Sequence, residues 1–331
     1  MALATRPTFF FGRLTVMIWR MQRLFTGLQP SGTLHIGNYF GALKPFVELS
    51  REYDANLMIA DYHALTSLKS ASDLRANILN VAKDYIAAGI DPEKSVIFKQ
   101  SDVPEHTELS WIFQCLVTVP FLQQAHAYKD KVAKGLEANA GLFAYPMLMA
   151  ADILLYDTDV VPVGSDQRQH VEYAREAAAK FNNAFGETFK EPQEKILEEV
   201  AVVPGTDGKK MSKSYGNTIP LFGTKDEIAK AVMSIVTDST GDVPENVYAI
   251  HKVVKTEAEL ASVYQAHKGK YKALKDALVE DIEAIVAPMR EKRDSISDDE
   301  ARRILADGAE RARAQASKKM ADVRVKVGVS L

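Results

Sequence analysis

Short apolar runs of strand length alternate with longer helical patterns through the first half of the chain. The apolar runs cover residues 24–28, 56–61, 95–100 and 159–163. Helical spacing occupies residues 36 to about 52, residues 72 to about 88, and the stretch PEHTELSWIFQCL. Such alternation is typical of a parallel sheet with helices on both faces. The sequence therefore predicts an α/β fold built on a parallel sheet.

The second half of the chain changes character at the segment VVPGTDGKKMSKSYGNTIPLF, residues 202–222. This segment is rich in Gly, Lys and Ser, and strand-like runs become scarce beyond it. Helical patterns then dominate, for example in TKDEIAKAVMSIV and YKALKDALVEDIEAIVAPMREKRD. We expect a helical second domain there. At the other end, residues 1–20 are basic and aromatic but lack a cleavage pattern, so they are expected to be a dispensable extension before Met21.

The composition limits the class of protein. No apolar run reaches the length of a membrane span, and 47% hydrophobic residues in 331 are ordinary for a globular chain. The single cysteine, Cys115, excludes an internal disulfide framework and a multi-thiolate metal centre within one chain. We therefore expect a reducing, cytoplasmic location and no membrane partner. The net charge of −3 means that a nucleic-acid partner must be met by local basic patches.

A glycine-rich corner follows the first predicted strand, in TGLQPSGTLHIGNYFGAL at residues 26–43. Strand, turn and helix in this order place backbone N–H groups and a helix dipole at the carboxyl edge of a parallel sheet. Gly32 and Gly37 permit close approach to the backbone, while His35 and Asn38 carry hydrogen-bond donors. The corner suits a polyanion such as a nucleotide. A turn glycine beside a surface histidine is the alternative.

A second corner is the loop DGKKMSKSYGN, residues 207–217, with Lys209, Lys210 and Lys213 among small polar residues. A mobile loop with several ammonium groups can close over a triphosphate and neutralise charge that develops during phosphoryl or nucleotidyl transfer. Taken alone, the loop could equally be a solvated charge run. Taken with the first corner, it indicates a nucleotide site.

Both corners resemble the two signatures of class I aminoacyl-tRNA synthetases: HIGN is similar to the first, and KMSKS matches the second. Together with YPMLMAADILLYDTDVVPVGSDQRQHVE, they resemble the bacterial-type tryptophanyl-tRNA synthetase family in particular, from about Gln22 to the C-terminus. The first signature ends in Asn38 rather than His, a departure that is usual among the tryptophan enzymes. The resemblance implies a Rossmann-like nucleotide-binding domain joined to a helical anticodon-binding domain.

The resemblance implies a two-step reaction. The carboxylate of L-tryptophan attacks the α-phosphorus of ATP, which gives tryptophanyl-adenylate and pyrophosphate, and the tryptophanyl group then passes to tRNA(Trp). The first step is an in-line displacement at phosphorus, in which positioning and electrostatic stabilisation carry most of the catalysis. Mg²⁺ would share that task, held mainly by phosphate oxygens and water, and no metal-ligating protein residue is predicted.

The resemblance also assigns nucleotide and catalytic residues. His35 and Asn38 would donate to the phosphates, Lys210 and Lys213 would grip the pyrophosphate, and Lys131 would reach in from an insertion. The residues expected to border ATP are Gln29, Pro30, Ser31, Gly37, Asn38, Gly164, Ser165, Asp166, Val202, Lys210, Met211, Ser212, Lys213 and Ser214.

The tryptophan pocket is expected along FAYPMLMAAD, residues 143–152. Asp152 follows an apolar run, and a carboxylate buried there needs a partner such as an indole N–H. A site built to accept that N–H would reject phenylalanine. The alternatives are a surface or salt-bridged Asp152 and a core His63 with a satisfied ring. By the resemblance, tryptophan would contact Phe25, Gly27, His63, Tyr145, Met149, Asp152, Val161, Val163 and Gln167, with Tyr145 and Gln167 on its α-ammonium.

The resemblance further implies a domain order and partners. Residues 21–199 would form the catalytic domain with a connecting insertion at about 111–142, and residues 200–294 the KMSKS loop and anticodon-binding domain. Residues 295–331 would be a C-terminal helix that packs back on the catalytic domain. The chain would form a homodimer through the insertion, although the apolar insertion could equally be core. The basic residues of the last helix would either meet phosphates or form a solvated face; they are Arg311, Arg313, Lys318 and Lys319.

Three other functions compete with this interpretation. Tyrosyl-tRNA synthetases share the fold and both signatures, but the MAADILLY and VGSDQRQH contexts favour tryptophan. A nucleotidyltransferase acting on a small acceptor would use a similar glycine-histidine corner but seldom needs so long a helical domain. A non-catalytic paralogue would have no need of both His35 and Lys213.

Overall fold

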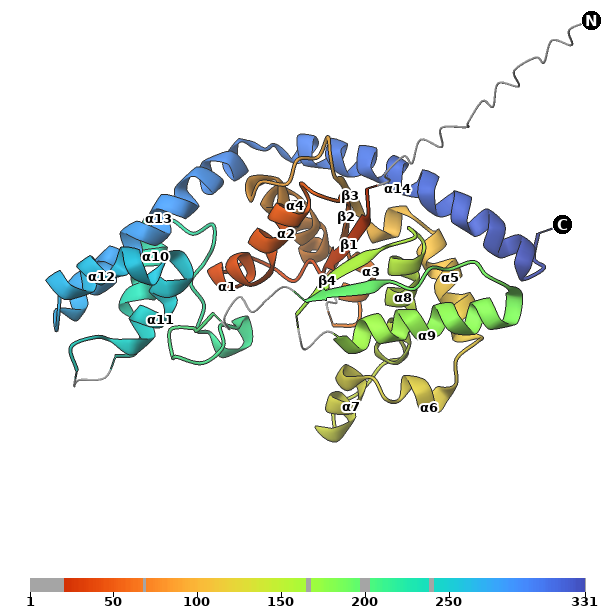
Figure 1. Cartoon of the computed structure of the whole chain (residues 1–331), viewed down its shortest axis with the longest axis horizontal. Helices are drawn as coiled ribbons and strands as arrows, with labels where there is room; N and C mark the ends of the chain where they lie inside the picture. Colours follow the sequence, from red (N-terminus) through yellow and green to blue (C-terminus); the bar gives the residue numbers. More distant parts are fainter. Residues whose placement is uncertain (1–20, 68–69, 165–167, 197–202, 238–240, 331) are drawn as a thin grey trace, which may run out of the picture.

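The computed structural model describes residues 21–67, 70–164, 168–196, 203–237 and 241–330. At its centre is a five-stranded sheet with the order β3-β2-β1-β4-β5, in which all the named strands pair in parallel (Figure 1). The strands are β1 (Arg23–Leu28), β2 (Asp54–Ile59), β3 (Val96–Lys99), β4 (Val160–Val163) and β5 (Gln193–Ile196). The predicted α/β fold with a parallel sheet is confirmed.

Four of the strands coincide with the predicted apolar runs, whereas β5 was not predicted. It has the sequence QEKI, is only partly buried, and lies at the edge of the sheet beyond β4. An edge strand of this kind has no continuous apolar run from which a sequence analysis could detect it.

Successive residues of the strands enter two different hydrophobic cores. Leu24 and Leu57 belong to one core, and the residues that follow them, Phe25 and Met58, belong to the other, because side chains alternate between the faces of a sheet. The first core continues through α1, α2 and α4 into α10, α11 and α13, so the sheet and the helical second half share one apolar interior. The second core contains α5, α8, α9 and α14.

The helices cover both faces of the sheet (Figure 1). One side carries α1, α2 and α4 and, beyond them, α10 to α13, while α6 and α7 project away from the sheet. No helix in the described ranges is long and apolar enough to cross a membrane. The bounds are α1 (Ile36–Asn38), α2 (Lys44–Leu49), α3 (Asp61–Ala64), α4 (Ala71–Ala87), α5 (Glu105–Gln114), α6 (Val119–Leu122), α7 (His126–Ala133), α8 (Ala140–Leu154), α9 (Arg168–Phe185), α10 (Lys225–Met233), α11 (Glu245–Val254), α12 (Glu257–Ala266), α13 (Tyr271–Ser295) and α14 (Asp298–Lys326).

The helix predicted from residue 36 is continuous but not uniform. A π-helical turn at Tyr39–Leu43 separates α1 from α2. Pro45 follows in the first turn of α2, and it has no backbone N–H to donate to the preceding turn. The wider turn before a proline accommodates this missing donor, and such turns are frequent near functional sites.

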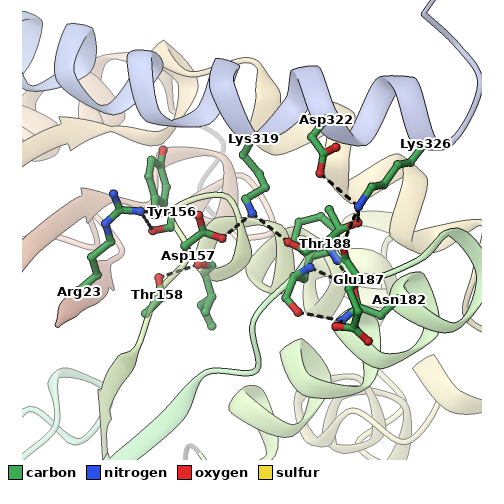
Figure 2. A network of polar contacts seen from close by, with 12 residues as sticks. Arg23, Tyr156, Asp157, Thr158, Asn182, Glu187, Thr188, Lys319, Asp322 and Lys326 are labelled. Carbon is green, nitrogen blue, oxygen red and sulfur yellow. Dashed lines mark hydrogen bonds and ion pairs between the residues drawn. The ribbon is translucent and has the colours of Figure 1, made fainter. Parts of the chain in front are cut away.

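The last helix, α14, returns to the sheet and packs against β3, α4 and α5. Its C-terminal half is tied to two loops by the polar network in Figure 2. Lys319 Nζ lies 2.5 Å from Asp157 Oδ1 and donates to the carbonyl of Thr188 at 2.9 Å. Lys326 Nζ donates to the carbonyl of Glu187 at 2.5 Å and to Thr188 Oγ1 at 2.7 Å. These contacts fix α14 along the sheet.

The basic residues of α14 were expected either to meet phosphates or to form a solvated face. Three of the four instead bind other parts of the chain. Arg311 donates to the carbonyls of Pro92 and Ser95, Arg313 donates to that of Asp102, and Lys319 makes the contacts above. Their cationic heads therefore help to hold the helix in place.

Replacing Gly308 with alanine should destabilise the protein. A Cβ there would lie 1.8 Å from the backbone oxygen of Ile97, so α14 would have to move away from β3. Overpacking of this kind costs about 1–3 kcal/mol, which urea denaturation would measure as a lower free energy of unfolding. Gly41→Ala is the control, since this helical glycine has open space around it and alanine there should be neutral or stabilising. Equal stability of both variants would contradict the close packing of α14.

Candidate active site

A cavity of about 280 Å³ lies at the carboxyl ends of β1 and β4, close to the lower size range of ligand pockets. The strand order reverses between these two strands, and open α/β sheets bind ligands at such a switch point. Its lining residues are Phe25, Thr26, Gly27, Gln29, Met58, Ala60, His63, Tyr145, Met149, Asp152, Ile153, Val161, Pro162, Val163, Gly164, His170 and Val171.

Asp152, on α8, is the acidic group of this cavity and is only 1% exposed. His63 Nε2 lies 2.7 Å from its Oδ2, and Gln100 Nε2 donates to its Oδ1 at 2.8 Å. His106 Nδ1 lies 2.6 Å from Oδ1. The expectation that a buried Asp152 needs an indole N–H as its partner is therefore wrong, because the protein itself supplies three polar neighbours.

These neighbours keep Asp152 ionised. Burial raises the pKa of this carboxyl. His106 and His63 together lower it by more than burial raises it, and the resulting pKa is about 2. An ionised carboxylate only accepts hydrogen bonds, so the cavity presents a fixed acceptor in a mostly apolar wall. A ligand with an N–H or O–H on an otherwise apolar body matches this surface.

A second cavity, of about 330 Å³, adjoins the first and shares Gln29, His63, Tyr145 and His170 with it. Tyr145 stands between them, with its hydroxyl 3.1 Å from His170 Nε2. Burial raises the pKa of Tyr145, so its hydroxyl stays protonated and available for hydrogen bonding. Helix α7 lines the second cavity through His126, Ala127 and Asp130.

The glycine-rich corner is ordered by a reciprocal cap at the start of α1. His35 Nδ1 accepts from the backbone N–H of Asn38 at 3.2 Å, and Asn38 Oδ1 accepts from the backbone N–H of His35 at 3.1 Å. Burial, and to a smaller degree the charge of Lys213, lower the pKa of His35 to about 4. The ring is therefore neutral near pH 7, with its proton on Nε2 as a hydrogen-bond donor.

The segment at residues 207–222, called the lysine loop below, docks directly on this corner. The backbone N–H of Ile36 donates to Ile219 O at 3.0 Å, and that of Leu221 donates to Leu34 O at 3.0 Å. Lys213 Nζ donates to the carbonyl of Ser31 at 3.0 Å. The two predicted corners, distant in the sequence, thus meet at one edge of the sheet.

Asn217 organises the loop from inside and was not predicted. It is buried, accepts from the backbone N–H of Ser212 at 2.8 Å, and donates to Asp207 Oδ1 at 2.6 Å. It also donates to the carbonyl of Lys210 at 3.2 Å. Asn217 directly follows the sequence KMSKSYG, and all three of its partners lie within the same loop, so its role depends on the folded shape of the loop.

Apart from Lys131, the predicted site residues divide into four groups. Eight of the nine tryptophan candidates line the first cavity, namely Phe25, Gly27, His63, Tyr145, Met149, Asp152, Val161 and Val163. Gln29 and Gly164 line it as well. The predicted residues that belong to the two docked corners are Pro30, Ser31, His35, Gly37, Asn38, Lys210, Met211, Ser212, Lys213 and Ser214. Ser165, Asp166, Gln167 and Val202 lie outside the described residues.

Two of the predicted residues have surroundings that differ from the expectation. Lys131 lies on α7 but lines neither of the two cavities described above. Gly37 was expected to leave room for a ligand, whereas a Cβ there would lie 2.9 Å from His35 Nδ1 and 3.3 Å from Met211 Cβ. The glycine thus allows the cap and the loop to pack together. Among the residues that the structure describes, no group of three or more His, Cys, Asp or Glu is placed to hold a metal ion.

A sequence model of the family described as tRNA synthetases class I (W and Y) matches residues 20–298. The chain therefore belongs to this family of class I tRNA synthetases. Among its relatives, the tryptophan–tRNA ligase of Fusobacterium nucleatum is 48% identical and aligns over 93% of this chain and 98% of its own length. That of Campylobacter jejuni is 47% identical over 93% of this chain and 100% of its own.

The fold agrees with these similarities. The crystal structure of tryptophanyl-tRNA synthetase from Campylobacter jejuni complexed with ADP and tryptophan has a TM-score of 0.88 and 46% identity to this chain. The match covers 93% of this chain and 100% of that one. The enzyme from Mycoplasma pneumoniae has a TM-score of 0.80 at 30% identity, over 93% and 98% of the two chains.

The lowered pKa of His35 predicts a pH-dependent stability. Between pH 6.5 and about 4, the unfolded chain binds a proton at this histidine that the folded chain does not, so this group makes stability fall as the pH falls. His35→Asn keeps a good helix cap but removes the titration. Urea denaturation at pH 7 and pH 5 should therefore show the variant gaining stability relative to the wild type at the lower pH. A relative stability that is the same at both pH values would contradict a neutral, buried His35.

Proposed function

We propose that the chain is a tryptophan–tRNA ligase, which activates L-tryptophan with ATP and transfers the tryptophanyl group to tRNA(Trp). The observation that carries the proposal is the ionised Asp152 in the wall of a mostly apolar cavity at the switch point. The identity of 46–48% to tryptophan–tRNA ligases of three bacteria supports it. An indole combines a large apolar body with one N–H, which is the ligand chemistry that this cavity suits.

In the proposed complex the indole enters the first cavity and donates its N–H to Asp152. Phe25, Val161 and Val163 would contact the rings, with Gly27, His63 and Met149 completing the wall. Tyr145 and Gln167 would hold the α-ammonium, and the hydrogen bond between Tyr145 and His170 supports the orientation of the tyrosine hydroxyl. Phenylalanine would leave the carboxylate without the substrate donor and should be rejected strongly.

ATP would lie between the two docked corners, next to the amino-acid cavity. His35 Nε2–H and the Asn38 amide would donate to phosphate oxygens, and Lys210 and Lys213 would neutralise the charge that passes to the leaving pyrophosphate. Lys131 would approach from the insertion as the loop closes. The other nucleotide contacts proposed are Gln29, Pro30, Ser31, Gly37, Gly164, Ser165, Asp166, Val202, Met211, Ser212 and Ser214. Mg²⁺ held by phosphate oxygens and water would supply further charge neutralisation.

Lys213 would change partners when ATP binds. In the structure its ammonium group donates to the Ser31 carbonyl, a neutral acceptor. Burial lowers its pKa, so the charged form is partly desolvated. A phosphate oxygen is a stronger, charge-assisted acceptor than a carbonyl, and the exchange would favour closure of the loop on the nucleotide.

The domain order, the tRNA contacts and the dimer belong to the same proposal. Residues 200–294 would read the anticodon, and the insertion at 111–142 would form the interface of a homodimer. The insertion exposes several large apolar side chains, which supports an interface more than a core; they are Trp111 (67% exposed), Val119, Val132 and Leu136. Residues 295–331 would support the catalytic domain 21–199.

Pyrophosphate exchange with purified protein tests the proposal directly. Exchange between ATP and labelled pyrophosphate should depend on L-tryptophan, and tyrosine should not replace it. Charging of total tRNA should then label tRNA(Trp) alone. Exchange with tyrosine instead would identify the rival synthetase, and exchange without tRNA charging would identify a nucleotidyltransferase.

Asp152→Asn should weaken tryptophan binding far more than ATP binding. The amide has the shape of the carboxylate but lacks its charge, and a lost charged hydrogen bond costs about 1.5–3 kcal/mol, or roughly 10- to 150-fold in affinity. The KM values for both substrates in pyrophosphate exchange measure the effect. Equal increases in the two KM values would remove Asp152 from the indole site.

Lys213→Ala should slow adenylate formation by about 100-fold or more, because one donor to developing charge is lost. Tryptophan affinity, measured by equilibrium dialysis, should hardly change. Lys209→Ala is the matched control: this exposed lysine belongs to the same loop but is not among the residues proposed to contact the nucleotide. A similar loss of rate in both variants would point to general loop charge and would refute a specific role for Lys213.

A further inference from the structure

The carboxylate of Asp152 is held from behind by two residues that do not line either cavity. Gln100 follows β3 and donates to Oδ1 at 2.8 Å, and His106 on α5 places Nδ1 2.6 Å from the same oxygen. Both side chains are 0% exposed. Neither residue can therefore touch a substrate in the first cavity.

The two oxygens of Asp152 have different surroundings. Oδ1 accepts a hydrogen bond from Gln100 and lies 2.6 Å from His106 Nδ1 on the buried side, whereas Oδ2 contacts His63, which lines the cavity. An ionised carboxylate offers about four acceptor positions. His63 takes at most one of the two positions on Oδ2, so another position on this oxygen is left for a donor from a ligand.

The position of His106 is itself fixed by its neighbours. Its Nε2 lies 2.8 Å from the hydroxyl of Tyr156, and its ring stacks on Phe98 with centroids 6.1 Å apart. Tyr156 in turn stacks on Phe25, a wall residue of the cavity, at 5.6 Å. Gln100 is anchored as well, because its Oε1 accepts from the backbone N–H of Tyr62 at 3.1 Å.

We propose that His106 and Gln100 are positioning residues for amino-acid selection: they hold Oδ1 of Asp152 and so reserve Oδ2 for an N–H of the substrate side chain. This inference rests on the proposed function, since it needs a substrate N–H for Asp152 to accept. A site must hold its acceptor within a fraction of an ångström to discriminate, and buried partners that act through another residue provide that restraint. Without them the carboxylate can rotate, and the N–H is recognised less sharply.

The test compares L-tryptophan with β-(benzothiophen-3-yl)-L-alanine, in which sulfur replaces the indole N–H. In wild-type pyrophosphate exchange, the ratio of the two kcat/KM values should strongly favour tryptophan. Gln100→Met and His106→Leu should each lower that ratio by about tenfold or more, through the KM for tryptophan. The KM for ATP should not change. His106→Asn retains a side-chain N–H and should recover part of the ratio.

Phe113→Leu is the matched control, because Phe113 is fully buried on the same helix and in the same core but does not contact Asp152. It should loosen the packing and leave the ratio unchanged. If His106→Leu does not fold by circular dichroism, Gln100→Met decides, since methionine removes the amide with little change of shape. An unchanged ratio in the folded variants overturns the inference and leaves the proposed function standing. A wild type without tryptophan-dependent exchange overturns the proposed function itself.

Discussion

The main-chain docking of the lysine loop onto the turn after β1 is the constraint on which the rest of the site depends. Two backbone hydrogen bonds, between Ile36 and Ile219 and between Leu221 and Leu34, join segments that are far apart in the sequence. These bonds do not use the side chains, so Lys213 remains able to exchange the Ser31 carbonyl for another acceptor. The described parts of the two corners are therefore joined through their main chains without a ligand, which lowers the cost of bringing them together when an anion binds.

The electrostatics around this contact favour an anionic ligand. His35 is neutral because burial and Lys213 lower its pKa, and burial lowers the pKa of Lys213 as well. Behind the loop, burial raises the pKa of Asp84 to about 6 even though Arg293 and Lys213 oppose the shift. The ion pair of Asp84 with Arg293 also links α4 to α13. Partly desolvated cations at the front of the site would gain the most from a bound polyanion.

Most of the fold could be predicted because buried parallel strands appear as continuous apolar runs, and this held for β1 to β4 but not for the polar edge strand β5. Site residues could be predicted where they lie in segments that resemble the motifs of a known family. His35, Lys213 and Asp152 lie in such segments. Gln100 could not, since it lies 52 residues from Asp152 in sequence and only the fold brings the two together. Asn217 was missed for a different reason: its partners lie within ten residues, but its burial results from the folded shape of the loop.

Helix α5 connects the end of the chain to the proposed amino-acid site. One side of α5 carries His106 beside Asp152, and neighbouring positions meet α14: Ser317 Oγ donates to Glu105 Oε1 at 2.6 Å, and Arg324 Nε donates to Glu108 Oε1 at 2.7 Å. The placement of His106 thus depends on a helix that α14 holds against the sheet. The packed and hydrogen-bonded contacts of α14 thus support α5, and α5 in turn places His106 beside Asp152.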